Sequence, residues 1–404
     1  MLPVENKKSV SLIQYYYRVI FFLLIFFIAF DGVRDSLIFS DYLSYVREAT
    51  ILLAFIPLIR SLNFKFKISL FSFSLLMMFF VFSYGSVYSV FPIYPDLRSV
   101  SDPLVVLYKH FQFFILLFCF VNIEKLTGQD VKYYAALLVY MLVFIAVITP
   151  IVYISPPSFF KSDFLQWGRM GIGYPTMDAQ IFCFGIIIIL YMLDFNRVLN
   201  NIVLGCLIVG VLMQVTATGM FTLFSICMFF IFLDKKNKIS SFLPLFLGLF
   251  FVVSYIITLY SDDLTKILWL ASDKIDNLMN YGQGQSTQIR HEQFEFLFNI
   301  INSRLDLLLF GIGSNVYVEN QYSFFFIAFG LVGLVVYLGY IFIMMVIGIK
   351  SIRIDHGLFF LSTMIFALVS YSLITFYLYS LYAMYAFMTA YHIINCRKFV
   401  YLGK

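Results

Sequence analysis

Charged residues are scarce in this sequence of 404 residues: they make up 12% of it, whereas 62% of the residues are hydrophobic. A water-soluble globule of this size needs more polar side chains to cover its surface, so we predict an integral membrane protein. The long apolar runs also lack the strand-like alternation of polar and apolar residues, which excludes a barrel and favours spanning helices. The small net charge of +5 comes from short clusters between apolar runs and gives no reason to expect nucleic-acid binding.

Cysteine is rare as well. The five cysteines lie within or at the ends of apolar runs and form no CxxC pair, so neither a disulfide nor a thiolate metal site is expected. Lys7-Lys8 and the apolar run 19–30 resemble the first two parts of a signal peptide, but no small-residue cleavage site follows. We therefore predict that this run is a retained first span.

Several catalytic motifs are missing. The sequence has no HExxH, GxSxG or Walker loop, and no Asp-X-Asp in the loops assigned below to the outer face. These absences argue against a zinc hydrolase, a serine hydrolase and a nucleotide hydrolase. They also argue against phosphate transfer that depends on a bound metal ion. No metal or other cofactor is expected, and any leaving phosphate would have to be neutralised by arginine.

The apolar runs predict an all-α, polytopic membrane protein that forms a single transmembrane domain over residues 1–404. At about 20 apolar residues per span, the runs give about twelve transmembrane helices. They lie near residues 12–30, 41–59, 68–90, 103–122, 131–154, 176–193, 199–216, 217–233, 240–260, 321–348, 357–377 and 379–396. Asp31 to Asp35 is predicted to be a short loop, and Arg47-Glu48 interrupts the second span either as a partly buried charge pair or because the span starts later.

The distribution of cations predicts the orientation. With the N-terminus in the cytoplasm, the inner segments carry about twice as many Lys and Arg residues as the outer ones, as the positive-inside rule requires. The even number of spans then places both termini in the cytoplasm. The two longest outer loops, 155–176 and 261–317, share the opposite face, which is periplasmic in a Gram-negative cell. Any chemistry is expected there.

The loop 261–317 is predicted to be ordered. Apolar residues at helical spacing predict a surface helix over 264–278 and a second helix from about Ile289 to Leu309. Arg290 and Arg304 lie near the edge of the apolar stripe of the second helix, so both guanidinium groups are expected to reach one cavity. Two arginine forks suit a diphosphate, because each fork binds phosphate oxygens at two points.

The outer loops also contain two short segments in which several candidate site residues lie close together in sequence. In one, His291 adjoins Arg290, as a helper group or as part of a solvated helix start. In the other, Arg169 lies among three glycines with Trp167 and Tyr174, a pattern that allows close approach of a phosphate and stacking of a sugar, although a plain loop between two spans looks the same.

The segment before the tenth span supplies the candidate base. Glu319 is placed to take a proton from a sugar hydroxyl, unless it is an ordinary interfacial acid, and Asn320 and Tyr322 would then position sugar hydroxyls. The preceding Gly311-Ile312-Gly313 is typical of a helix C-cap followed by a turn. In the fourth span, Lys109-His110 is either functional or a helix-packing pair, since charge is costly there.

Taken together, these features resemble the O-antigen polymerase (Wzy-type) family and the related O-antigen ligases. The features are the many spans, the large outer loop, a Gly-X-Gly turn followed by an acid, Asn and an aromatic residue, and a span that contains Gly330 to Gly333. The resemblance implies a GT-C-like glycosyltransferase of the bacterial inner membrane that acts in lipopolysaccharide biosynthesis. It would join repeat units linked to undecaprenyl pyrophosphate by inverting transfer, with a chain-length regulator and membrane lipid as partners.

The same resemblance assigns roles to individual residues. Arg169 and Arg290 resemble the two outer-loop arginines that hold pyrophosphate, and Glu319 stands where ligases tend to carry a histidine before the asparagine, which favours a polymerase. The stretch 214–219 is similar to a family motif but lacks its arginine, and the family's Arg-to-Gly loop spacing is missing. Two alternatives remain: an O-antigen ligase, and a non-catalytic polysaccharide flippase or transporter, which would hold its charges inside the bundle along a central path.

Overall fold

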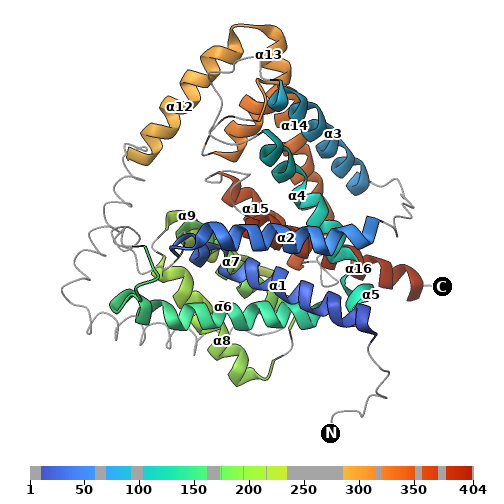
Figure 1. The fold of residues 1–404 in the computed structure, drawn as a ribbon, viewed down its shortest axis with the longest axis vertical. Coiled ribbons are helices and arrows are strands. Elements are labelled where there is room, and N and C mark those ends of the chain that lie inside the picture. The colour runs from blue at the N-terminus through green and yellow to red at the C-terminus, as the bar shows by residue number, and fades with distance from the viewer. Residues whose placement is uncertain are drawn as a thin grey trace.

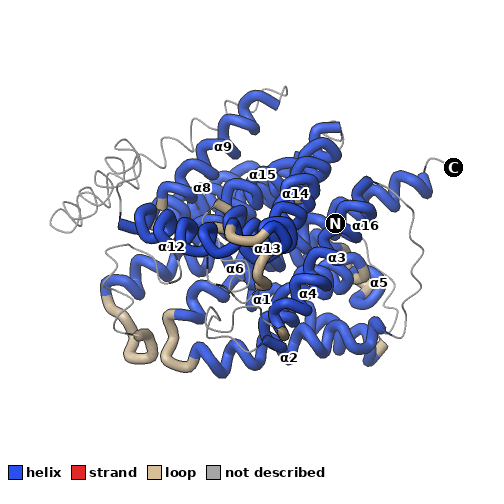
Figure 2. The backbone as a smooth tube through the Cα atoms, turned by 90° about the horizontal axis from the view of Figure 1, so that it is seen from above, coloured by secondary structure: helices blue, strands red, loops and turns tan. Residues whose placement is uncertain are grey.

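The computed structural model describes residues 11–59, 70–91, 103–161, 173, 175–193, 195–214, 216–233, 285–314, 316, 318, 320–350, 357–371 and 379–402. Regular structure in these residues is helical throughout (Figures 1 and 2), apart from one isolated bridge between Leu37 and Phe160. The all-α prediction is confirmed for this part of the chain.

The helices follow the predicted spans closely. A helix is present at every predicted span except 240–260, which lies outside the described residues. The helices are α1 Leu12–Asp35, α2 Ser40–Ile59, α3 Leu70–Val90, α4 Pro103–Val121, α5 Ile123–Thr127, α6 Val131–Ile154, α7 Pro175–Tyr191, α8 Arg197–Met213, α9 Ala217–Leu233, α12 Gln285–Asn302, α13 Leu305–Phe310, α14 Gln321–Lys350, α15 Gly357–Ser370 and α16 Tyr379–Leu402.

Among the described helices, four are both long and apolar enough to cross a membrane: those over Leu12–Arg34, Phe71–Tyr88, Val131–Val152 and Gln321–Lys350. Large apolar side chains such as Phe73, Phe80 and Phe342 are more than half exposed on the helix surfaces, as suits a surface covered by lipid. The structure thus supports a membrane-embedded helical protein, and the count of twelve spans stays a prediction.

Two details of the predicted helix ends are wrong. The segment Asp31 to Asp35 is not a loop, because α1 continues through it to Asp35. The predicted helix from Ile289 to Leu309 is two helices, because the chain is extended at Arg304 (φ −142°, ψ 134°) between α12 and α13. Leu305, expected on the buried face, is 72% exposed.

The apolar face of α12 is otherwise as predicted. Leu297 and Ile301 are buried, while Phe294 and Phe298 stack against Phe326 of α14, with ring centroids 6.3 and 6.0 Å apart. Helix α12 therefore packs on the bundle through an apolar stripe, as its sequence pattern indicates. The other predicted loop helix, 264–278, lies outside the described residues.

The helix α14 folds back on itself at Gly330. Phe325 and Tyr337 are stacked with ring centroids 4.0 Å apart, although twelve residues of straight helix would separate them by about 18 Å. Gly330 has the non-helical angles φ 68° and ψ −167° that allow the reversal. The halves 321–329 and 331–350 thus pack against each other, and only the second half has the length of a single span.

The reversal is held by the segment that follows α13. The carbonyl oxygens of Ile327 and Ala328 accept hydrogen bonds from the backbone N–H groups of Ile312 (3.1 Å) and Gly313 (3.0 Å). The next carbonyl, that of Phe329, accepts from the Tyr84 hydroxyl of α3. Residues 312 and 313 are therefore hydrogen-bonded to the end of the first half of α14, just before the reversal. Non-helical backbone of this kind is tolerated at membrane depth where protein covers it.

Gly311 also confirms the expected helix C-cap. It ends α13 with φ 78°, and its N–H donates to the carbonyl of Leu307 at 2.7 Å. In Figure 1 α12 rises to α13 at the top of the molecule, and α14 and α3 lie directly beneath α13. The outer-loop helices are therefore joined rigidly to the fold-back of α14.

Candidate functional site

Four ionisable side chains from two helices form a buried charge cluster: Asp31, Arg34, Arg47 and Glu48. Arg47 is at its centre, with a side chain that is 3% exposed. Its Nη1 lies 2.6 Å from Asp31 Oδ1, and its Nε donates to Glu48 Oε1 at 3.0 Å. Arg34 Nε lies 3.0 Å from the same Asp31 oxygen. Mutual pairing offsets much of the desolvation cost of each charge.

Two further helices complete the cluster. Gln112 of α4 donates through Nε2 to Glu48 Oε2 at 3.2 Å, and the backbone N–H of Ser380 in α16 donates to Asp31 Oδ2, also at 3.2 Å. The Arg47 guanidinium carbon lies 4.9 Å from the centre of the Tyr379 ring, as in a cation–π contact. The cluster therefore ties α1, α2, α4 and α16 together.

The cluster lies toward one end of α1 and α16. Asp31 and Arg34 are in the last two turns of α1 and Ser380 is in the first turn of α16, whereas Arg47 is two turns inside α2 and Gln112 is in the middle of α4. In the orientation predicted from the positive-inside rule, these ends of α1 and α16 would face outward, and that orientation stays a prediction.

Asp178, in the first turn of α7, is a further buried carboxylate near this end of α1. A Cβ added to Gly32 would lie 1.9 Å from Asp178 Oδ1, and one added to Gly173 would lie 1.9 Å from Oδ2. Both glycines are therefore needed for the close approach of this carboxylate. Gly173 is one of the three glycines for which the sequence predicted close approach of a phosphate, and in the structure it accommodates Asp178; the other two, and Arg169, lie outside the described residues.

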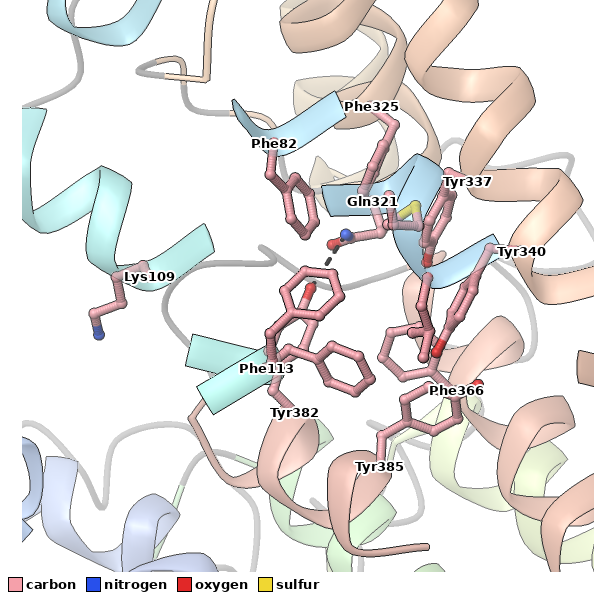
Figure 3. Close-up of a pocket in the computed structure, with 13 residues that line it drawn as sticks. Phe82, Lys109, Phe113, Gln321, Phe325, Tyr337, Tyr340, Phe366, Tyr382 and Tyr385 are labelled. Atoms are coloured by element: carbon pink, nitrogen blue, oxygen red, sulfur yellow. Dashed lines mark hydrogen bonds between the residues drawn. The ribbon is translucent and has the colours of Figure 1, made fainter. Parts of the chain in front are cut away.

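Next to the charge cluster is an aromatic pocket (Figure 3). Its cavity is small, with about 30 Å³ open to the centres of water molecules. Gln321, 1% exposed, projects among the rings and donates through Nε2 to the Tyr382 hydroxyl at 3.2 Å. The pocket is lined by Leu75, Met78, Phe82, Lys109, Phe113, Phe114, Gln321, Phe325, Tyr337, Tyr340, Phe366, Tyr382 and Tyr385.

The charge cluster and the aromatic pocket are connected. Helix α4 contributes Gln112 to the cluster and Phe113 to the pocket, and α16 contributes Tyr379 to the cluster and Tyr382 to the pocket. Lys109 lines the pocket and interacts electrostatically with both Arg47 and Glu48. In Figure 3 its ammonium group points away from the rings. The two arginines of the cluster are paired with two carboxylates, so the further cation at the aromatic cavity is Lys109. One cation beside aromatic walls suits an anionic ligand that also carries an apolar or sugar part.

Two of the predicted substrate-binding residues are at the surface. Arg304 lies at the start of α13 with a side chain 53% exposed, and its Nη2 is 2.6 Å from Asp306 Oδ2. Its hydrogen bond to Asp306 holds the pKa of that carboxyl below the ordinary value. His291 on α12 is 69% exposed and lies 3.1 Å from Glu295. Neither residue is among those that line the aromatic pocket.

Asn320 and Tyr322 adjoin the pocket residue Gln321 in the chain and make structural contacts. Asn320 Oδ1 accepts hydrogen bonds from the backbone N–H groups of Tyr322 (2.9 Å) and Ser323 (3.2 Å), so it caps the first half of α14. The Tyr322 hydroxyl donates to the carbonyl of Ala367 in α15. Their predicted contact with sugar hydroxyls stays a prediction.

Other predicted site residues fall elsewhere. Glu319, Arg169, Trp167 and Tyr174 lie outside the described residues, and of Arg290 only the backbone, in α12, is described. Of the candidates, then, Tyr322 contacts the pocket residue Tyr337, with ring centroids 5.7 Å apart, Asn320 caps the helix before it, and Arg304 and His291 are on the surface.

Sequence reasoning found the charge cluster only in part. The interpretation of Arg47-Glu48 as a partly buried charge pair is confirmed, and Lys109 was singled out for its cost inside a span. Asp31 was missed, because it was assigned to a loop and its contact with Arg47 spans sixteen residues. The signal that identifies it is an acid within one helical turn of Arg34 at the end of an apolar run.

Comparisons with known proteins add no name to this geometry: no protein-family model and no curated protein matches the chain. Within the described residues, no group of three or more His, Cys, Asp or Glu side chains is arranged to hold a metal ion. The charge cluster and the aromatic pocket together are therefore the candidate site.

Proposed function

We propose that this protein is a lipopolysaccharide O-antigen polymerase, or a closely similar polysaccharide polymerase. It would join repeat units linked to undecaprenyl pyrophosphate at the outer face of the bacterial inner membrane, by inverting and metal-independent glycosyl transfer. The observation that carries the proposal is the position of Lys109, which lines an aromatic pocket and interacts with the buried charge cluster around Arg47. A lipid-linked sugar diphosphate has both parts that such a site suits, an anionic group and a sugar.

The chemistry makes two demands on the chain. Single displacement at an anomeric carbon requires positive charge to stabilise the departing pyrophosphate and a base to take the proton of the acceptor hydroxyl. Arg169 and Arg290 are proposed for the first demand, as the resemblance implies, with Lys109 as a further cation from within the bundle. Glu319, which precedes the capping Asn320 in the chain, is proposed as the base.

A transporter is the second candidate, and two observations favour it. Charged residues lie inside the helix bundle, and α14 is interrupted at Gly330, both of which occur in transporters. The buried charges, however, form one compact cluster, toward the ends of α1 and α16 that are predicted to face outward, rather than a path through the bundle. A one-sided group of charges supports chemistry at one face better than passage across the membrane.

Deletion of the gene followed by electrophoresis of the lipopolysaccharide separates the candidates. A polymerase-null strain shows core carrying one repeat unit, whereas a ligase-null strain shows core alone. A flippase-null strain also shows core alone, without the core that carries one repeat unit, because no lipid-linked unit reaches the outer face. Core with one unit supports the proposal, and either of the other patterns contradicts it.

A variant at Arg290 tests the assigned anion ligand. Arg290→Ala is expected to give core plus one unit while the protein remains in the membrane at the wild-type level. Arg290→Lys keeps the charge but not the planar fork, so it should restore the ladder only in part. A normal ladder from Arg290→Ala would reject the role of this residue.

A further inference from the structure

Three polar atoms of residues that line the aromatic pocket have no hydrogen-bond partner among the described residues: Gln321 Oε1 and the hydroxyl oxygens of Tyr340 and Tyr385. Of the three, only the Gln321 oxygen has no proton of its own to donate. Gln321 is 1% exposed, and its Oε1 has no hydrogen-bond partner in the structure, while its Nε2 is bound to the Tyr382 hydroxyl. A buried acceptor left unpaired costs stability, so such a group in a native protein calls for a donor that is supplied from elsewhere. Because Gln321 lines the pocket, a ligand can supply that donor there.

Two other buried glutamines resemble Gln321 but do not line the pocket. Gln180 and Gln214 also have carbonyl oxygens without partners, and both are at most 1% exposed. Neither lines the aromatic pocket. Gln321 thus combines an unpaired acceptor with a cavity beside it, and Gln180 offers a matched control.

The size of the cavity limits what can enter. About 30 Å³ open to water centres corresponds to roughly two or three water molecules. A whole sugar ring is larger than this, and a polyprenyl chain much longer. One substituent of a sugar fits. The walls determine which substituent is favoured, and they are aromatic rings apart from Gln321, Lys109 and the side chains of Leu75 and Met78 on α3.

We infer that the aromatic pocket binds the acetamido group of an N-acetylated amino sugar. The acetamido N–H donates to Gln321 Oε1, and the methyl group packs against the aromatic walls formed by Phe366 and Tyr385, which are themselves stacked at 4.2 Å. A plain sugar hydroxyl supplies the donor but leaves the apolar walls without a partner. This inference rests on the proposed function, because it takes the sugar to be part of a lipid-linked glycan.

Lys109 relates this subsite to the rest of the site. It lines the pocket and interacts with Arg47 and Glu48 of the charge cluster, while its ammonium group points away from the rings (Figure 3). A sugar whose acetamido group occupies the pocket therefore has its ring outside the pocket, where a cation is at hand for a phosphate. The acetamido subsite would select the sugar, and the cations would bind the anionic part.

The test is saturation-transfer NMR on the full-length protein in nanodiscs, with three small probes at millimolar concentration. The probes are the methyl glycosides of N-acetylglucosamine, N-acetylgalactosamine and glucose. The expected result is transfer to the acetyl methyl protons of both N-acetyl sugars and little transfer to the glucoside. Equal transfer to all three probes, or none to any, would overturn the inference.

Two variants locate the binding. Gln321→Leu keeps the volume and removes the acceptor, and should weaken N-acetyl sugar binding about tenfold. Met78→Phe fills the cavity from α3 without touching the amide and should abolish the methyl signal. Gln180→Leu, an equally buried change outside the pocket, should bind as the wild type does. Wild-type binding by both Gln321→Leu and Met78→Phe means that water alone occupies the pocket, and the inference fails.

This result is independent of polymerisation. If the protein makes no polymer yet binds N-acetyl sugars through Gln321, the subsite stands and the proposed function falls, as for a transporter of the same glycan. If polymer is made and the N-acetyl probes bind no better than glucoside, the polymerase stands and the subsite falls.

Discussion

The backbones of Gly330 and Leu309 are in direct contact: a Cβ added to Gly330 would lie 2.3 Å from the carbonyl carbon of Leu309. Gly330 also has φ +68°, a conformation that side chains rarely adopt. This contact joins the end of α13 to the fold-back of α14, so the outer-loop helices and the aromatic pocket depend on the same glycine.

Replacement of Gly330 by alanine should therefore destabilise the protein strongly. Backbone strain alone costs about 1–3 kcal/mol, and the clash with Leu309 adds to it. Thermal unfolding in detergent, followed by fluorescence-detected size exclusion, should show a large loss of folded protein. Gly339→Ala is the control on the same helix, because nothing lies within 4 Å of its added Cβ. Equal stability of the two variants would contradict the fold-back.

Arg47 and Asp31 should prove strongly coupled in stability. Arg47→Met leaves two carboxylates without their shared cation and should cost about 3–5 kcal/mol. Asp31→Asn should also destabilise, since it weakens the partner of both Arg47 and Arg34. The double variant should be less unstable than the sum of the single variants. Additive losses in a double-mutant cycle of unfolding temperatures would show that the two side chains do not interact.

The exposed pair of Arg304 and Asp306 should have little effect on stability at neutral pH, because solvent screens it. Arg304 lowers the pKa of Asp306, so the contribution of the pair is present above the unfolded pKa of Asp and is lost as the pH falls through the lower folded value. The unfolding temperatures of wild type and Arg304→Ala should differ by less than about 2 °C at pH 7. The two unfolding temperatures should converge in strong acid, where Asp306 is protonated. A difference that grows as the pH falls would contradict the lowered pKa of Asp306.

Asn320 should act as a helix cap whatever its role toward substrate. Asn320→Ala removes the acceptor for the N–H groups of Tyr322 and Ser323 and should cost about 1 kcal/mol. Asn320→Asp keeps the acceptor and should retain most of that stability. If both variants are equally stable but neither makes polymer, Asn320 contacts substrate rather than capping the helix.

Much of the helical framework could be predicted from the sequence, because long apolar runs have few other solutions in a membrane. The bounds of α6 and α9 coincide with the predicted spans 131–154 and 217–233, and α1 begins at the predicted residue. The main difference at α1 is its extension to Asp35, where the charges Asp31 and Arg34 suggested a loop. Their mutual pairing inside the bundle explains why the helix continues.

The fold-back of α14 could not be predicted from hydropathy, because both halves are apolar and a positive φ leaves no periodic signal. The glycines at 311, 313 and 330 were noted as a turn and as part of a span, and only their contacts relate them. The aromatic pocket was missed for the same reason: its rings come from five helices distant in sequence, and aromatic residues at helical spacing are equally typical of lipid contact.

Reconstitution tests the central claim most directly. Purified protein in liposomes is given lipid-linked repeat units extracted from the deletion strain, with no other enzyme present, and the products are separated by length. The account predicts a ladder of lipid-linked polymers that Arg290→Ala and Glu319→Gln abolish. Single repeat units that remain unchanged in the presence of folded wild-type protein would contradict it.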